Sequence, residues 1–241
     1  MNRVFTRDLD ISVYRERSKL SSKDPDPKKL RLNSYPEISK EFKRNRAKHI
    51  VVKPLVETQN TLDMLEYFPH SKALWMYRHY KDFIQSNMKR FVVDAGSKAL
   101  KAIAVRDPDN WRSQKVSDYV HSIVIEYYKP EINEYDATAL FWFARNHLFY
   151  DLDLDTHSDV FMCRYEDLVR YPQKMVREIY SFMEAEYPAK NDFLKEINTQ
   201  SVGKGSAVEL SPEIEALCEK LLTKMNHTYL IKHPQFKTIE R

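Results

Sequence analysis

The sequence predicts an α/β fold in which helices cover a parallel sheet. Residues 73–77 form an apolar run that ends at Arg78 and continues into apolar residues at helical spacing, as expected for a buried strand, a turn and a helix. A β-branched strand at residues 49–53 and a helix at residues 57–68 precede it. Strand, helix, strand and helix in this order are typical of right-handed parallel βαβ units.

The composition limits the domain organisation. The 241 residues, 42% of them hydrophobic, suffice for one good-sized domain. We expect a polar N-terminal extension at residues 1–47 and a single α/β domain at residues 48–241. The net charge of +4 mildly favours anionic ligands and does not indicate nucleic acid.

The cysteine pattern and the apolar runs indicate the cellular compartment in which the protein is expected. Cys163 and Cys218 belong to no CxxC pair, which predicts reduced thiols rather than a disulfide framework or a zinc site. No apolar run reaches the roughly 18 residues of a membrane span, and no signal-peptide pattern opens the chain. We therefore expect a cytoplasmic protein.

The remaining elements follow in chain order. A surface helix at residues 36–48 carries basic residues, for which a solvated face is the favoured interpretation and nucleic-acid binding the weaker alternative. The aromatic stripe of the helix at residues 135–150 favours core packing over a ligand site. Further helices are expected at residues 116–128, 173–183, 190–200 and 212–226, a third strand at 159–164, and a polar hinge at 201–206.

The motifs point to an anion site. The sequence has no HExxH, no GxSxG and no cluster of Cys or His at metal spacing, so metal-dependent and serine hydrolysis have no support. Ligands of open α/β sheets bind at the carboxyl ends of the strands, where Arg78 and Lys53 are expected. Ser86 follows Arg78 by eight positions, and the loop with Lys204 and Gly205 could fold over the anion with its N–H groups.

Two segments resemble the family of sulfotransferases that use 3′-phosphoadenosine 5′-phosphosulfate (PAPS), in its bacterial type. Residues 72–86, KALWMYRHYKDFIQS, are similar to the family's strand, turn and helix with a Ser eight residues after the Arg. Residues 163–183, CRYEDLVRYPQKMVREIYSFM, are similar to its Y-E-D-L segment. Residues 201–221, SVGKGSAVELSPEIEALCEKL, are similar in position to the loop that folds over the nucleotide.

The resemblance implies a three-layer parallel sheet of the P-loop nucleotide fold, with the first βα unit and its 5′-phosphosulfate loop missing or truncated. It implies transfer of a sulfuryl group from PAPS, without a metal, to a hydroxyl or amine of a small-molecule or glycan acceptor. By this resemblance Arg78 and Ser86 bind the 3′-phosphate, Lys204 and Gly205 belong to the covering loop, and Lys53 lies near the sulfuryl group.

The resemblance assigns no catalytic base, because Leu55 stands where cytosolic members have a His two positions after the Lys. We expect Tyr165, Glu166 and Asp167 to hold the corner between a strand and a helix. The alternative function is a non-catalytic, truncated sulfotransferase-fold protein that uses the helix at residues 135–150 as an interaction module.

Overall fold

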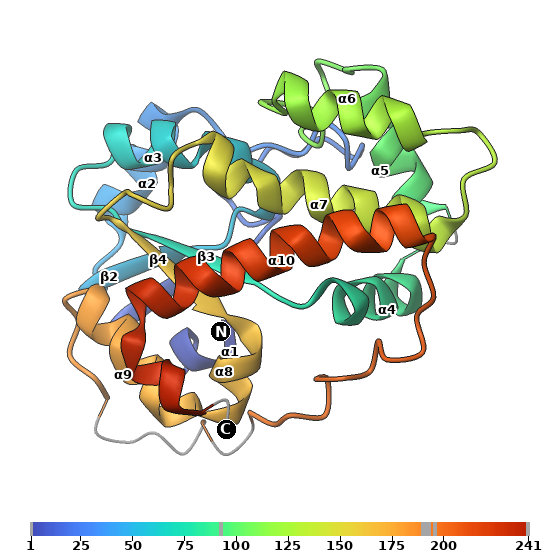
Figure 1. Cartoon of the computed structure of the whole chain (residues 1–241). Coiled ribbons are helices and arrows are strands. Elements are labelled where there is room, and N and C mark those ends of the chain that lie inside the picture. The colour runs from blue at the N-terminus through green and yellow to red at the C-terminus, as the bar shows by residue number, and fades with distance from the viewer. Residues whose placement is uncertain (1, 92–93, 189–193, 195–196, 240–241) are drawn as a thin grey trace.

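Two pairs of parallel strands lie at the centre of the protein, whose computed structural model describes residues 2–91, 94–188, 194 and 197–239 (Figure 1). Strand β1 (Ile11–Tyr14) pairs with β2 (His49–Val52), and β3 (Ala73–Tyr77) pairs with β4 (Val160–Arg164). The mixed α/β class with short parallel strands is thereby confirmed. We expected β2 and β3 to be neighbours, but each takes a different partner, and in the described part no strand joins the two pairs.

The first 47 residues contribute a strand and buried side chains. Helix α1 (Asn2–Phe5) and strand β1 precede α2 (Tyr35–Arg44). Val4 and Ile11 are buried in the main core, whereas Leu20 and Ile38 form a second, smaller core. Strand β1 was not expected, because four residues, ISVY, between charged neighbours give too short a pattern to identify a strand from sequence.

Helices pack around the strands. Figure 1 shows α10 crossing in front of the strands beside α7, with α4 near its N-terminal end. The segment expected to be helical at residues 57–68 begins as a 3-10 helix before it becomes α3. The helical elements after α2 are η1 (Leu55–Asn60), α3 (Thr61–Tyr67), α4 (Tyr80–Arg90), α5 (Ala95–Ala104), α6 (Asp118–Tyr127), α7 (Glu134–Asp151), α8 (Tyr165–Arg170), α9 (Pro172–Phe182), α10 (Pro212–Lys232) and η3 (Pro234–Ile239).

Helix α7 is the centre of the main core. Its aromatic residues Trp142, Phe143 and Phe149 are buried, which confirms the expectation that the stripe is core. A helix that is apolar on most sides must be enclosed, and α4, α5, α6 and α10 all pack against α7. Asn133 caps its N-terminus by accepting a hydrogen bond from the Asp136 N–H at 2.9 Å.

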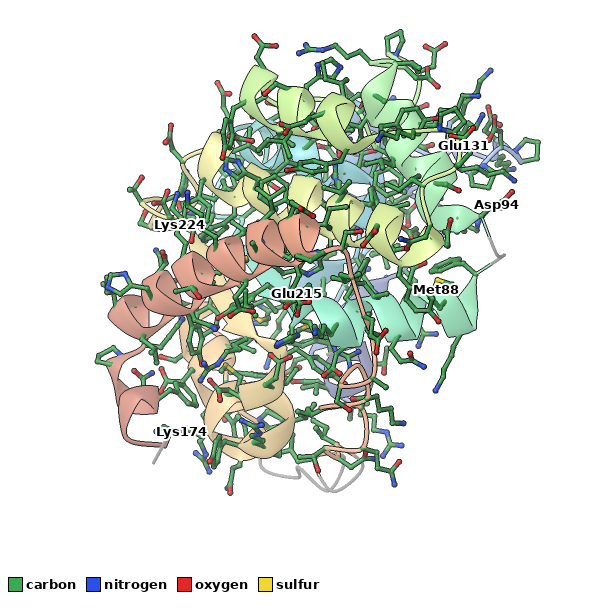
Figure 2. All side chains as sticks on the ribbon, turned by 45° about the vertical axis from the view of Figure 1, so that its right-hand side comes forward. Met88, Asp94, Glu131, Lys174, Glu215 and Lys224 are labelled. Carbon is green, nitrogen blue, oxygen red and sulfur yellow. The ribbon has the colours of Figure 1, made fainter. Side chains whose placement is uncertain are left out.

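The N-terminal half of α10 is tied to α4. Figure 2 marks Glu215 on α10 where this helix passes α4, and its Oε1 lies 2.5 Å from Lys81 Nζ. Pro212 begins α10, as the sequence predicts, and the helix runs further than residue 226. The helix expected at residues 190–200 lies largely outside the described residues.

Both cysteines are free and buried, in agreement with the expected thiols. Burial raises the pKa of the Cys163 thiol to about 12 and also raises that of Cys218, so neither is a reactive thiolate at neutral pH. None of the helices within the described ranges combines the length and apolar character needed to cross a membrane.

Candidate functional site

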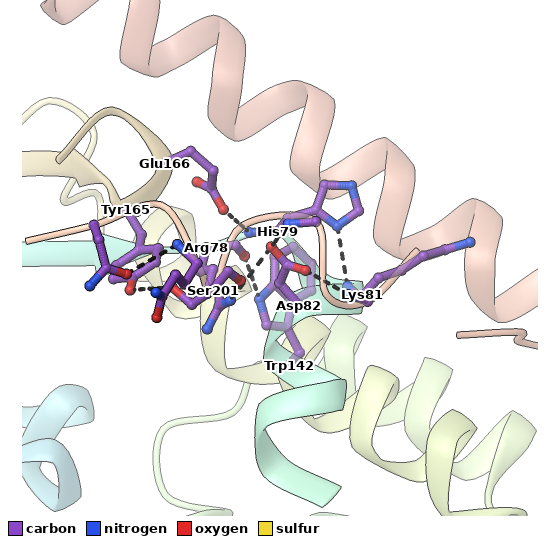
Figure 3. Close-up of polar contacts among 12 residues, drawn as sticks. Arg78, His79, Lys81, Asp82, Trp142, Tyr165, Glu166 and Ser201 are labelled. Atoms are coloured by element: carbon purple, nitrogen blue, oxygen red, sulfur yellow. Dashed lines mark hydrogen bonds and ion pairs between the residues drawn. The ribbon is translucent and has the colours of Figure 1, made fainter. Parts of the chain in front are cut away.

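Arg78 lies immediately after β3, at the carboxyl end of the strand (Figure 3). Its guanidinium carbon is 4.8 Å from the centre of the Tyr165 ring, and its Nη2 lies 3.5 Å from Asp82 Oδ2. The same nitrogen donates a hydrogen bond to the Ser201 carbonyl oxygen. Its buried Nε has no hydrogen-bond partner among the described residues, so one donor remains unused there.

The predicted covering loop lies over the start of α4. Asp82, in the first turn of α4, accepts hydrogen bonds from the Gly203 N–H at 2.9 Å and the Gly205 N–H at 2.7 Å. A Cβ atom at position 205 would collide with the backbone carbonyl group of Lys81, so only glycine permits this approach. Lys204, between the two glycines, is exposed.

The structure thus brings the loop and Arg78 together, as the sequence predicts. It also shows that the Gly205 N–H, which we expected to face an anion, already donates to Asp82. Ser86 is exposed on α4, about 9 Å along the helix axis from Tyr80 at the usual helical rise.

The Tyr165 to Asp167 segment holds the corner between β4 and α8. Glu166 Oε1 accepts a hydrogen bond from the His79 N–H at 3.0 Å, and Arg164 Nε donates to Asp167 Oδ2 at 2.8 Å. The Tyr165 hydroxyl lies 2.7 Å from the Ser201 hydroxyl oxygen. The expected role of this segment in holding the corner is confirmed. The Tyr165 ring also packs against the Arg78 guanidinium.

A second set of charged residues follows the other strand pair. Tyr14 pairs with Val52 at the ends of β1 and β2, and the Lys53 N–H donates to the Tyr14 carbonyl oxygen at 2.9 Å. Because the strands are parallel, Lys53 and Glu16 leave the sheet at the same edge. Lys53 is exposed and Glu16 is half-buried.

Glu16 is a candidate residue that sequence reasoning missed, since β1 was not recognised. Burial raises the pKa of its carboxyl group, while Lys53 is the strongest of the influences that lower it. Its Oε1 is buried and has no hydrogen-bond partner in the part of the chain that the structure describes. A half-buried carboxyl group with a raised pKa and an unpaired oxygen beside a lysine can accept a proton from a substrate.

Helix α7 contacts the loops that follow both β2 and β3. Trp142 Nε1 donates to the Arg78 carbonyl oxygen at 3.1 Å, and Arg145 Nη2 donates to Gln59 Oε1 at 3.0 Å. Gln59 belongs to η1, directly after Lys53 and Pro54. Arg78 and the segment that follows Lys53 are therefore both anchored on α7.

The residues around Arg78 are suited to bind an anion such as a phosphate group. Arg78 supplies a guanidinium with an orphaned donor, Tyr165 supplies an aromatic surface, and the loop around Lys204 supplies a further positive charge. A guanidinium group can bind two phosphate oxygens through a pair of parallel N–H donors. The chemistry that this arrangement supports best is the binding of a phosphorylated ligand at Arg78, while Lys53 and Glu16 follow the other strand pair.

Comparison with known proteins gives structural neighbours only. No protein-family model matches the chain, and no curated protein matches it either. The chain is similar to the sulfotransferase from Alicyclobacillus acidocaldarius, with a TM-score of 0.51 and 14% identity over 95% of this chain and 88% of that one. It is also similar to the sulfotransferase domain from the curacin biosynthetic pathway, with a TM-score of 0.50 and 14% identity over 79% and 67%.

A third neighbour is the sulfotransferase domain from the Synechococcus PCC 7002 olefin synthase, with a TM-score of 0.49 and 17% identity. The match covers 79% of this chain and spans 63% of the length of that domain. The fold assignment rests on the other two neighbours. At these identities the likeness concerns the fold, and at that level the resemblance read from the sequence is confirmed.

Proposed function

We propose that this chain is a sulfotransferase that moves a sulfuryl group from PAPS to a hydroxyl or amine of an acceptor. The proposal rests on the buried Nε of Arg78, which has no hydrogen-bond partner among the described residues. Arg78 lies at the end of β3, close to the loop that contains Gly203 and Gly205. A buried donor without an acceptor is costly, and a phosphate oxygen would satisfy it.

The proposal keeps three of the four nucleotide contacts that the resemblance implies. Arg78 binds the 3′-phosphate, and Ser86 contributes its hydroxyl from α4. Lys204 adds charge from the exposed side of the loop, while Gly205 holds the loop in place through Asp82 rather than touching the phosphate. The sulfonucleotide, when bound, supplies the sulfuryl group for the reaction.

Lys53 and Glu16 are the proposed catalytic residues. Sulfuryl transfer places negative charge on the equatorial and leaving-group oxygens, and the Lys53 ammonium would stabilise that charge. Glu16 Oε1 would accept the proton of the attacking hydroxyl or amine as the nucleophile bonds to sulfur. The bond between sulfur and the phosphate oxygen breaks in the same step, and adenosine 3′,5′-bisphosphate leaves. Burial raises the pKa of the Glu16 carboxyl group, and the charge of Lys53 opposes this rise.

A direct assay tests this proposal. The protein is incubated with PAPS and a panel of hydroxyl and amine acceptors, and adenosine 3′,5′-bisphosphate and sulfated products are measured by mass spectrometry. We expect product formation that Lys53→Met abolishes. If the protein binds the bisphosphate but sulfates none of the acceptors, the enzymatic function is contradicted and a binding protein is favoured.

The non-catalytic alternative has one specific observation in its favour. The Arg78 guanidinium already contacts Ser201, Asp82 and Tyr165, so the site is held closed by the protein's own groups. If the chain binds no nucleotide, this network is purely structural. Arg78→Gln would then lower stability, and neither the wild type nor the variant would bind adenosine 3′,5′-bisphosphate.

A further inference from the structure

Two arginine side chains pack against the ring of Trp111, and a third lies near them. The guanidinium carbon of Arg112 lies 4.6 Å from the centre of the Trp111 ring, and that of Arg145 lies 5.2 Å from it. Arg31 is close enough to lower the pKa of Arg112, in addition to the larger effect of burial. The cluster therefore joins three cations from the segment after β1, the segment before α6, and α7.

The cluster lacks a carboxylate partner within the described structure. Arg145 donates to two neutral oxygens, Gln59 Oε1 at 3.0 Å and the Trp111 carbonyl oxygen at 3.4 Å, and Arg112 donates to Asn110 Oδ1 at 3.4 Å. Among the described side chains none forms an ion pair with Arg31, Arg112 or Arg145 within 4.0 Å.

Carboxylates act on two of the three arginines without forming an ion pair. Asp26 acts on Arg112 at longer range, and Glu57 and Asp109 act in the same way on Arg31. On Arg145 the only charge that acts is the like charge of Arg112. Within the described ranges, Arg145 is therefore the cation of this cluster that has no carboxylate near it.

Crowded, partly desolvated cations are unfavourable without an anion. Burial, with a further contribution from Arg112, lowers the pKa of the Arg145 guanidinium to about 9. An arginine carries five N–H donors, so the hydrogen bonds of Arg145 to Gln59 and Trp111 leave others for an oxyanion. A bound anion would offset the repulsion and complete these hydrogen bonds.

The position of the cluster connects it to the reaction site. Gln59, which holds Arg145, is in the 3-10 helix that begins two residues after Lys53. At the usual rise of such a helix, positions 55 and 59 are about 8 Å apart along the axis. An acceptor that extends along this segment would place its nucleophile near Lys53 and an acidic group near Arg145.

We propose that Arg112 and Arg145 bind an oxyanion of the acceptor, a carboxylate or a sulfate, so that the acceptor is an acidic molecule. The identification of the bound molecule as the acceptor rests on the proposed sulfotransferase function. The anion site itself does not depend on that function. Trp111, which lies against both guanidinium groups, supplies a fluorescent reporter next to the bound anion.

The test is a titration of the protein with sodium sulfate and, separately, sodium acetate, at constant ionic strength, with tryptophan fluorescence as the readout. We expect saturable binding that Arg112→Gln and Arg145→Gln each weaken by at least about tenfold, the loss expected for one charge-assisted hydrogen bond. The anion that binds more tightly identifies the acidic group. The matched control is Arg106→Gln, because Arg106 is exposed and already pairs with Asp118.

The outcomes separate the anion site from the sulfotransferase proposal. Circular dichroism checks the fold of each variant, and Arg112→Gln decides the result if Arg145→Gln does not fold. A signal that does not saturate, or that Arg112→Gln and Arg106→Gln change equally, would overturn the anion site. Titration with adenosine 3′,5′-bisphosphate is independent of it: we expect Arg112→Gln to retain that affinity within about twofold.

Discussion

The Asp82 carboxylate accepts the Gly205 backbone N–H at 2.7 Å and so fastens the segment before α10 to the first turn of α4. The same carboxylate lies 3.5 Å from the Arg78 guanidinium. A single acidic residue therefore positions both the arginine and the loop that covers it. The proposed nucleotide site depends on this residue although Asp82 itself repels phosphate.

The first prediction concerns the close approach at Gly205. Gly205→Ala places a Cβ atom against the backbone of Lys81, so the loop must shift and its hydrogen bonds to Asp82 weaken. We expect a loss of about 1 to 3 kcal/mol in the free energy of unfolding, the usual cost of overpacking, measured by urea denaturation.

The neighbouring glycine provides the control. Gly203 has a φ of +78°, but no heavy atom lies within 4 Å of the point that an alanine Cβ would occupy, so Gly203→Ala carries only the backbone cost of about 1 to 2 kcal/mol. Adenosine 3′,5′-bisphosphate affinity should fall more for Gly205→Ala than for Gly203→Ala. Equal affinities for the two variants would show that the loop does not cover the nucleotide.

The second prediction concerns Glu16 as the base. Glu16→Gln keeps the shape of the side chain but cannot accept a proton, and we expect kcat/KM to fall by about 10²- to 10⁴-fold. Glu66→Gln, an exposed carboxyl group on α3, is the control and should leave the rate unchanged. A Glu16→Gln enzyme of full activity would remove Glu16 from the mechanism.

The pH dependence of the rate gives a separate test of Glu16. Burial raises the pKa of its carboxyl group above the ordinary value of 4.5, and a base works only when ionised. The rate should therefore fall on acidification through a pKa above 4.5, and this acidic limb should be absent in Glu16→Gln. A limb that persists in the variant belongs to another group.

The third prediction concerns stability and His233. Its buried ring lies 2.8 Å from the Met162 carbonyl oxygen, to which Nε2 donates, and burial lowers the pKa of the ring below 6.5. The unfolded state then binds more protons than the folded state as the pH falls below 6.5. The free energy of unfolding should decrease there by at most about 1.4 kcal/mol per pH unit.

His233→Phe tests this origin, because a phenyl ring can preserve the packing against Phe161 and Tyr229 without taking up a proton. Urea denaturation above and below a pH of about 6.5, the ordinary pKa of histidine, should show a smaller pH dependence in the variant. The same slope in both proteins would assign the effect to other residues.

How far the sequence predicts this structure depends on the length of each pattern. The five-residue strand at Ala73–Tyr77 and the long helix α7 were predicted because their apolar patterns are long and their ends carry clear turn residues. Strand β1 has only four residues, and without it the partner of β2 could not be predicted. Pairing depends on distant segments, which local patterns do not encode.

The same limit applies to the site. Arg78 was predicted because it lies in a long and fairly specific segment, and the covering loop was expected from a looser similarity in position. Glu16 was missed because it follows the strand that was not recognised. The engagement of the Gly205 N–H by Asp82 could not be predicted either. It arises from a contact between residues that are far apart in the chain.

The most direct test of the proposed nucleotide site is isothermal titration with adenosine 3′,5′-bisphosphate. We compare the wild-type protein with Arg78→Gln, and use Arg106→Gln, an exposed arginine that pairs with Asp118, as the control. We predict binding to the wild type and to Arg106→Gln, and at least about tenfold weaker binding to Arg78→Gln, as for loss of a charge-assisted contact. No binding to the folded wild type, or equal affinity in Arg78→Gln, would contradict the proposed site.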